Sequence, residues 1–537
     1  MSRRIYRQAL EATPEDHPDR THRLHSLGLG YRDRYQRTGA VADLELAIQH
    51  FKEAVVHSSS AILDRLRPAM KLLQLPLKTK HWELADEVAS TAVSLIPLLT
   101  PRSLENSDKQ YLLTKVSGLA SDAAAVVLMV GKTPYKAMQL LELGRGVIIV
   151  DQFIMPTVVP NQVNQRYDAG QKLEELIDDI RRLPGFDRFL MGPTEDELKA
   201  AAISGPIVTI NVSNYRCDTL IIEEHGLKSV PLPDLKRNDI EARAKALVNL
   251  DAQLLEWLWD TIAKPVLDAL GFTQKPNGAL VQSRQKHSTL LAERGSGKAV
   301  LIGIEKTSGL ADLAFVSQEI KELKRICGSM QLQVLTLLPF QKDVMAALKD
   351  CDIFHFAGYG STNQSDPSKS SLLLKDGPLT VASLFETNLQ SRMPFLAYLS
   401  ACGTGQVKHD KLMDEALHLV AAYQIAGFRH VIGTLWEVND ALCVDAATGI
   451  YKWMQDQKMT DDSVSEGLHR VSIKLRKAWL LENETRAANR MAALRNKSVP
   501  MDTEHTRSSQ GTTKDLRAVE LYEDAPLHWV PYVHFGI

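Results

Sequence analysis

The chain has 537 residues, which is enough for two to four domains, and its 44% hydrophobic and 24% charged residues are ordinary for a globular protein. The 63 Lys and Arg residues nearly balance the 65 Asp and Glu residues, so the net charge of −2 provides no general attraction to nucleic acid or acidic membranes. The sequence begins without the apolar core of a secretory signal and contains no apolar run of about 18 residues, so no membrane span is expected.

The cysteines point to a reducing compartment. There are five of them, widely spaced and without a C-x-x-C pair: Cys217, Cys327, Cys351, Cys402 and Cys443. An odd number with this spacing argues against a disulfide framework and against a thiolate zinc site. We therefore expect a cytoplasmic protein, with a nuclear location as the alternative.

After an N-terminal tail (1–21), residues 22–150 are expected to form helices, because alanine, leucine and charged residues recur there at helical spacing. One pattern of small residues returns three times, with offsets of four and three that place each trio on one helix face. The trios are Ala47, Phe51 and Ala54; Ala85, Ala89 and Ala92; and Ala137, Leu141 and Gly144.

Turn residues accompany these trios. Gly39 and Gly131 precede the first and third, and Pro97 follows the second. This arrangement resembles the tetratricopeptide repeat, a helix-turn-helix unit that stacks into a solenoid. The trios are irregularly spaced rather than repeating every ~34 residues, so an irregular helical domain remains the alternative.

Residues 151–205 are expected to form a helical linker region, with a charged surface helix over 170–183. From residue 206 the composition changes. Short runs rich in β-forming residues occur at 206–212 and 217–224. The continuous apolar run 298–304 is typical of a strand covered on both faces.

Strands and helices then alternate, which predicts an α/β domain with a mainly parallel sheet over 206–537. The expected segments are a helix over 313–323, a strand over 332–338, a helix over 343–350, strands over 352–357 and 395–401, a helix over 413–426, and strands over 430–436 and 528–537. The polar stretch 482–518 lacks aromatic residues and is predicted to be a mobile insertion.

Two of these strands run directly into small residues. The first continues into HFAGYG (355–360) and the second into LSACGTG (399–405). In an open α/β sheet, catalytic groups and ligands gather at the carboxyl ends of strands. Glycines there allow a backbone N–H to approach a reacting oxygen.

These motifs, together with DEALHLVAAYQIAGFRHVIGTLWEVND and the terminal WVPYVHFG, resemble the CHAT domain, a branch of the caspase, separase and gingipain clan of cysteine peptidases. The resemblance covers the region from about residue 200 onward and implies a caspase-like α/β fold. CHAT domains are commonly preceded by tetratricopeptide repeats, in agreement with the first 150 residues.

The resemblance implies roles for three residues. Cys402 falls on the nucleophile position, and the backbone N–H of Gly360 would pair with that of Cys402 as an oxyanion hole. Asp440 falls where separase-like enzymes place the acid that receives a substrate arginine. Ordinary alternatives are a buried inert thiol for Cys402, a turn glycine for Gly360 and a helix N-cap for Asp440.

The sequence departs from the family at the base position, where Tyr359 replaces histidine. A histidine titrates near pH ~6.5 and can accept the thiol proton, whereas a phenol titrates near ~10 and stays protonated at neutral pH. His409, in the loop after Cys402, and His355, on the strand before Tyr359, are the candidate substitutes. His355 should lie roughly 13 Å down its strand, at about 3.3 Å per residue, which favours a core role.

The leading hypothesis is a regulatory or peptide-binding protein with impaired catalysis. The alternative is an active cysteine endopeptidase that cleaves after Arg or Lys with an unusual base, and a third hypothesis is a scaffold whose helical repeats alone define the function. We expect protein partners at the repeats, a peptide in the α/β domain, and no nucleic acid, membrane, metal or cofactor. The run 294–298, RGSGK, is not a phosphate-binding loop, because Lys298 opens a strand rather than a helix.

Overall fold

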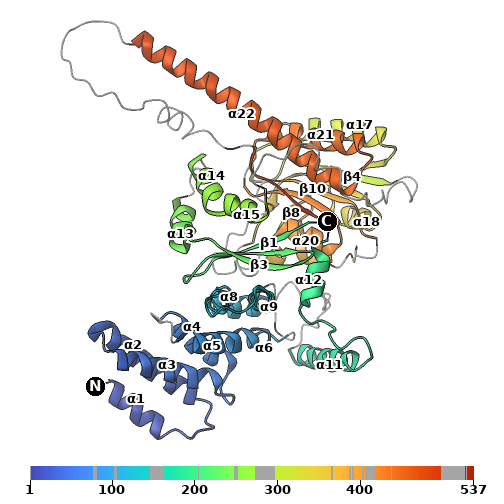
Figure 1. The fold of residues 1–537 in the computed structure, drawn as a ribbon. Coiled ribbons are helices and arrows are strands. Elements are labelled where there is room, and N and C mark those ends of the chain that lie inside the picture. Colours follow the sequence, from blue (N-terminus) through green and yellow to red (C-terminus); the bar gives the residue numbers. More distant parts are fainter. Residues whose placement is uncertain are drawn as a thin grey trace, which may run out of the picture. The chain divides into compact units, whose positions relative to one another are not determined.

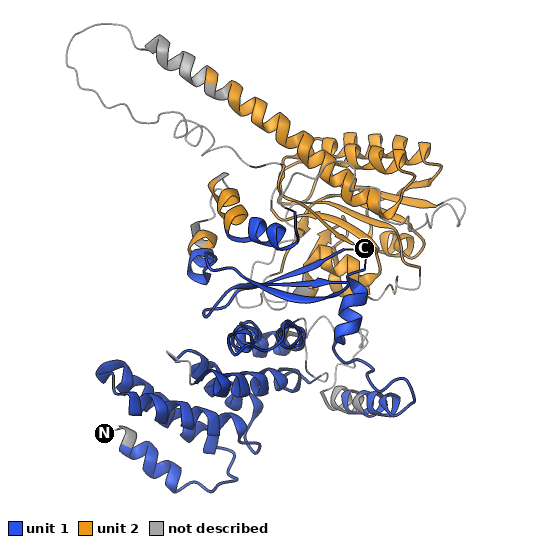
Figure 2. Ribbon diagram, in the orientation of Figure 1, with its two compact units in different colours: residues 1–241, 261–276, 409–416 blue, residues 242–260, 277–408, 417–537 orange. Residues whose placement is uncertain are grey.

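The computed structural model describes most of the chain. The described residues are 2–75, 81–101, 104, 106–145, 163–203, 205–246, 252–272, 297–363, 367–385, 387, 389, 392–401, 404, 418–436, 438–497, 527 and 529–536. They fall into two compact units (Figure 2). The first is built mainly from Met1–Glu241 and Thr261–Pro276, and the second mainly from Asn277–Lys408 and Leu417–Ile537.

The first unit is largely helical, as the sequence predicts (Figure 1). Its helices up to residue 201 are α1 (Ser2–Glu11), α2 (Arg20–Thr38), α3 (Val41–Val56), α4 (Ile62–Leu73), α5 (Trp82–Ser94), α6 (Ile96–Leu99), α7 (Asn106–Leu113), α8 (Leu119–Met129), α9 (Pro134–Gly144), α11 (Val163–Arg181) and α12 (Glu195–Ala201). The expected charged helix over 170–183 corresponds to the second half of α11.

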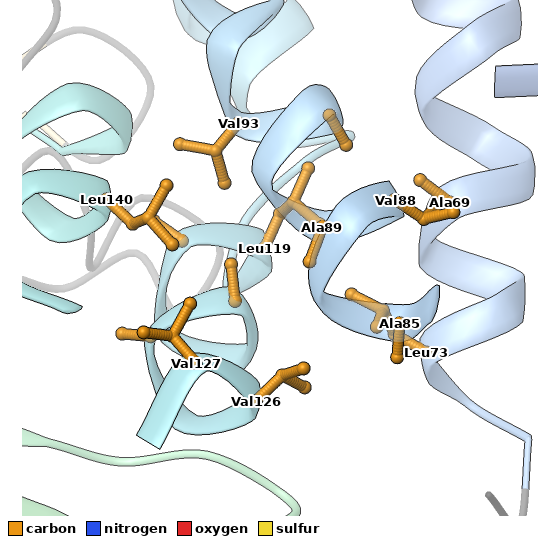
Figure 3. Packing of buried hydrophobic residues seen from close by; sticks show 14 of the residues in the cluster. Ala69, Leu73, Ala85, Val88, Ala89, Val93, Leu119, Val126, Val127 and Leu140 are labelled. Carbon is orange, nitrogen blue, oxygen red and sulfur yellow. The ribbon is translucent and has the colours of Figure 1, made fainter. Parts of the chain in front are cut away.

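The three small-residue trios lie on α3, α5 and α9, and every member is buried. Figure 3 shows Ala85 and Ala89 of α5 within this core. A Cβ atom on Gly144 would lie 2.6 Å from the Cβ of Ala120 on α8, so that position admits only glycine without a shift of a helix. The inward orientation of the trios is therefore confirmed, while their assignment to tetratricopeptide repeats stays a prediction.

A three-stranded antiparallel sheet packs against these helices within the same unit. Its strands are β1 (Ile207–Asn211), β2 (Asp218–Glu223) and β3 (Gly226–Pro231). Leu220 and Ile222 join the helical core, and the Asn211 side chain donates to the Ser121 carbonyl oxygen at 2.9 Å. The predicted domain start at residue 206 is untested, but these contacts connect residues 207–231 to the helices. Short helices α13 (Arg237–Ala246), α14 (Ala252–Leu258) and α15 (Lys264–Ala269) follow.

The second unit is built on a six-stranded sheet. Its strands are β4 (Lys298–Gly303), β5 (Gln333–Thr336), β6 (Ile353–Gly358), β10 (Leu396–Ala401), β11 (His430–Thr434) and β12 (Tyr532–Gly536), in the order β12-β11-β10-β6-β4-β5. All neighbouring strands are parallel except β12, which pairs antiparallel with β11. The mainly parallel α/β sheet expected from the sequence is confirmed.

Helices cover both faces of this sheet, which explains why its central strands are apolar throughout. They are α17 (Val316–Ser329), α18 (Gln341–Leu348), α19 (Val381–Phe385), α20 (Leu419–Ala426), α21 (Asp440–Asp456) and α22 (Asp461–Lys497). Leu323 of α17 and Ile450 of α21 share a core cluster with Leu396 of β10. On the opposite face, Phe354 of β6 stacks on Tyr423 of α20, with ring centroids 5.7 Å apart.

The predicted mobile insertion over 482–518 is wrong for its first part, because α22 continues as a helix to Lys497. Residues 498–518 lie outside the described part of the chain. The polarity of 482–497 suggests disorder, but the segment is rich in alanine, arginine and glutamate, which are strong helix formers.

A small antiparallel sheet was not anticipated. It comprises β7 (Gly360–Ser361), β8 (Ser371–Leu373) and β9 (Pro378–Thr380), strands too short for an alternating pattern to be visible in sequence. Among the described residues no single helix is long and apolar enough to span a membrane, although the bent pair Asp108–Thr114 and Leu119–Met129 passes that test by length and composition.

Candidate functional site

The strand ends that carry the two glycine-rich motifs are neighbours in the sheet. In the parallel register of β6 and β10, Gly358 lies opposite Ala401. Tyr359 is the next residue after Gly358, and Cys402 is the next after Ala401. Cys402 and His409 lie outside the described residues, so their roles stay predictions, but the strands that lead to the two motifs end side by side.

Tyr359 is bound through both its side chain and its backbone. Its hydroxyl donates to the Ala311 carbonyl oxygen at 2.9 Å, and its own carbonyl oxygen accepts from the Leu373 N–H at 2.9 Å. Ala311 belongs to the loop between β4 and α17. The phenol therefore uses its proton to hold a backbone carbonyl, which is the role of a donor rather than of a base.

Gly360 follows as the first residue of β7 and pairs with Leu372 of β8. This places it in a short strand beside the end of β6. The proposed oxyanion role of its N–H depends on Cys402 and stays a prediction.

Thr404, which follows β10 in the chain, is held to β11 by contacts that sequence reasoning missed. The Thr404 hydroxyl accepts from the Thr434 N–H at 3.0 Å, and the Thr434 hydroxyl donates to the Ala401 carbonyl oxygen at 2.8 Å. A Cβ atom on Gly433 would lie 2.5 Å from the Thr404 Oγ1, so the glycine makes room for the turn. The threonine in ACGTG and the glycine in HVIGT were the available signals.

Asp440 lies at the first turn of α21, but it is not the residue that caps that helix. The Asn439 side chain caps α21 by accepting from the Ala441 and Leu442 N–H groups. The Asp440 carboxylate instead accepts from the N–H of Phe315, the residue that precedes α17, at 2.9 Å. A carboxylate is favourable there because the amino end of a helix carries partial positive charge. Its role as a receptor for a substrate arginine stays a prediction.

His355 is a fully buried core residue. Its Nε2 lies 3.1 Å from the Glu319 carboxylate and its Nδ1 lies 3.3 Å from the Tyr451 hydroxyl, so both ring nitrogens have partners. Its ring also stacks on Tyr398, with centroids 4.8 Å apart. In the register of β6 and β10 it lies opposite Tyr398, which is three residues before Ala401 and therefore roughly 10 Å down the strand at about 3.3 Å per residue. These contacts favour the structural role over that of a substitute base.

Burial keeps two nearby tyrosines and one histidine neutral. Burial raises the pKa of Tyr398 and of Tyr451 well above their usual range, so both phenols stay protonated. Burial lowers the pKa of His418 to about 4, and its Nδ1 accepts from the Ala421 N–H at the start of α20. His418 is therefore a neutral helix cap.

The other thiols are inert for the same reason. All four described cysteines are buried: Cys217, Cys327, Cys351 and Cys443. Burial raises the pKa of Cys327 and of Cys351 to about 12, so neither forms appreciable thiolate at neutral pH. A thiol reagent applied to the folded protein therefore has little to react with among these four.

The mainly parallel sheet covered by helices, with two neighbouring strand ends that lead to the glycine-rich motifs, defines an α/β protein. A family model described as the CHAT domain matches residues 256–537, which is more than half of the chain. The chain therefore belongs to the CHAT domain family, as the sequence motifs indicate.

Two solved structures of gingipain match part of the chain. The Arg-specific cysteine proteinase gingipain R (RGPB) is 12% identical with a TM-score of 0.26, over 33% of this chain and 42% of its own. The complex of the pro- and mature domains of RgpB from Porphyromonas gingivalis is 14% identical with a TM-score of 0.25, over 34% of this chain and 44% of that one. The chain thus spans less than half the length of the gingipain chains. No curated protein matches.

Proposed function

We propose that this protein is a regulatory, peptide-binding member of the CHAT family with impaired peptidase catalysis. The observation that carries the proposal is the hydrogen bond from the Tyr359 hydroxyl to the Ala311 carbonyl oxygen, at the position where relatives place a basic histidine. A phenol ionises only near pH ~10, so at neutral pH it is protonated and is not basic enough to take the proton of a cysteine thiol.

The chemical consequence is large. Without an imidazole partner, the thiol of Cys402 should keep a pKa near ~8.5, with only a few per cent of thiolate at neutral pH. The leaving amine would also lack a proton donor. A positioned acid–base group typically contributes about 10²- to 10⁴-fold, so catalysis should fall by a factor of that order.

Peptide binding does not require the base. The nucleophile position Cys402, the backbone of Gly360 and the carboxylate of Asp440 are all retained. A peptide with a basic side chain would be recognised by the carboxylate and by backbone groups at the strand ends. The helical first unit would provide a second surface, for protein partners, in a cytoplasmic or nuclear setting.

The test compares the full chain with the variants Tyr359→His and Cys402→Ala. Each is offered an arginine-ended fluorogenic peptide and a thiol-reactive analogue of the same peptide. We expect the original chain to bind the peptide with little turnover, and Tyr359→His to gain turnover by at least about 10²-fold, the lower end of the range for an acid–base group. The gain must vanish when Cys402→Ala is combined with Tyr359→His.

Comparable turnover by the original chain and Tyr359→His, abolished by Cys402→Ala, would contradict impaired catalysis. It would favour the alternative of an active endopeptidase that cleaves after Arg or Lys. Absence of peptide binding in all variants would remove the peptide-binding part of the proposal.

A further inference from the structure

The loop between β4 and α17 lies beside the candidate site. We define the β4–α17 loop as residues 304–315. It leaves β4 with the Ile304 N–H bound to the Ala357 carbonyl oxygen at 2.9 Å, and it folds back on itself through the Leu313 N–H, which donates to the Glu305 carbonyl oxygen at 2.9 Å. The loop thus starts next to the strand that ends at Gly358.

Two hydrogen bonds connect this loop to Tyr359 and Asp440, the residues at the expected base and arginine-receiving positions. The Tyr359 hydroxyl holds its middle, at the Ala311 carbonyl oxygen. The Asp440 carboxylate holds its end, at the Phe315 N–H. The side chains at the base position and at the expected arginine-receiving position are therefore both engaged by one segment of the chain.

Burial of apolar side chains holds the loop only weakly. Ile304 is buried where the loop leaves β4, but further along the loop Leu310 is 45% exposed and Phe315 is 40% exposed. The ion pair between Lys306 and Asp312, at 3.5 Å, joins two exposed side chains within the loop and contributes little to its closure. A segment with few buried apolar contacts opens at a low free energy, so individual hydrogen bonds to the rest of the unit weigh heavily in its closure.

We infer that the Tyr359 hydroxyl is a latch that keeps the β4–α17 loop closed and so limits access of a basic peptide to Asp440. This inference rests on the proposed peptide-binding function. The Phe315 N–H occupies one oxygen of Asp440, Oδ2, so a guanidinium group that binds both oxygens in a bidentate manner would displace that N–H and move the end of the loop. Tyr359, which stands in place of the basic histidine, would thereby also regulate access to Asp440.

Tyr359→Phe is the direct test, because it deletes the hydroxyl and keeps the ring. Hydrogen exchange of the backbone amides of residues 305–315 is measured by mass spectrometry on the full chain. Loss of one hydrogen bond should speed exchange there by roughly twofold to tenfold. Equal exchange in the original chain and in Tyr359→Phe would overturn the latch.

Tyr135→Phe is the matched control. The Tyr135 hydroxyl also donates to a backbone carbonyl, that of Pro193, at 3.2 Å, but it lies in the other compact unit. Its loss should leave exchange over 305–315 unchanged. Equal acceleration by both variants would show a general loss of stability and would overturn the latch.

A second measurement links the loop to the site. Affinity for the arginine-ended peptide should rise by roughly twofold to tenfold in Tyr359→Phe and fall in Asp440→Asn. Faster loop exchange without a change in affinity would overturn control of the site by the loop. If no variant binds the peptide, both the proposed peptide-binding function and the control of access to Asp440 are wrong. Whether Tyr359 holds the loop is then decided by the hydrogen-exchange measurement alone.

Discussion

At the scale of single residues, the candidate site depends on close packing around a glycine. Gly433 of β11 faces both Thr404 and Val420, and a Cβ atom there would lie 2.3 Å from the Val420 Cγ2. Contacts under 3 Å require the neighbours to shift. The position therefore links the stability of the sheet to the turn that follows β10.

Gly433→Ala should destabilise the second unit by about 1–3 kcal/mol, the usual cost of overpacking a core. The measurement is the midpoint of urea unfolding. Gly226→Ala is a suitable control, because a Cβ atom on Gly226 has no neighbour within 4 Å. A Gly433→Ala variant as stable as the control would contradict the close packing.

The sequence predicts the roles of some single residues but not their long-range contacts. The replacement of a histidine by Tyr359 was visible in the motif, and so was the core role of His355 from its place on the strand. The partners of Tyr359 and Asp440 were not visible, because Ala311 and Phe315 are 48 and 125 residues away along the chain. Such contacts arise only once the sheet brings the loops together.

At the scale of elements, the last strand is attached through a chain of titratable groups. His430 of β11 lies between two partners: its Nε2 is 2.8 Å from the Asp461 carboxylate at the start of α22, and its Nδ1 is 3.0 Å from the Nε2 of His534 on β12. Arg429 pairs with the same carboxylate. A hydrogen bond between these two ring nitrogens needs a hydrogen on only one of them, so protonation of both would place two N–H groups against each other.

This arrangement predicts a pH dependence of stability. Burial, and then His430, lowers the pKa of His534 from 6.5 to about 4. The unfolded chain therefore binds more protons than the folded chain between these values, and stability is lost as the pH falls from about 6.5 to about 4. The loss from this residue is at most roughly 3–4 kcal/mol, at ~1.4 kcal/mol per pKa unit.

His534→Gln should flatten this dependence, measured as the urea midpoint at pH 7 and pH 4.5. The dependence should not disappear, because burial also lowers the pKa values of His25 and His418 to about 4. An unchanged slope in His534→Gln would show that protonation of this histidine does not affect stability.

The sequence predicts some helices and strands well and misses others. The central strands of the large sheet are predictable because they are largely apolar runs, and the helices of the first unit because small residues recur at helical offsets. The second half of α22 was missed because its polar composition suggested disorder, although its residues favour a helix. Composition alone does not distinguish an exposed helix from a loop.

At the scale of the whole molecule, the distribution of the thiols gives a simple prediction. Cys217, Cys327, Cys351 and Cys443 are buried, and Cys402 is the remaining cysteine of the sequence. A thiol reagent should therefore label about one cysteine in the folded protein, on the expectation that Cys402 is accessible, and all five after unfolding.

Cys402→Ala should abolish the labelling of the folded protein, as counted by mass spectrometry of the intact chain. Labelling that persists in this variant would place the reactive thiol elsewhere. Absence of labelling in the original chain would instead indicate that Cys402 is as inaccessible as the other four.

The antiparallel pairing of β12 with β11 also has a consequence for biosynthesis. Residues 435–531 separate the two strands along the chain, so the hydrogen-bonding edge of β11 stays open while they are translated. At about 5–20 residues per second, that interval lasts roughly 5–20 s. An open strand edge can pair with another nascent chain, so the yield of correctly folded protein should depend on chaperones that act during this interval.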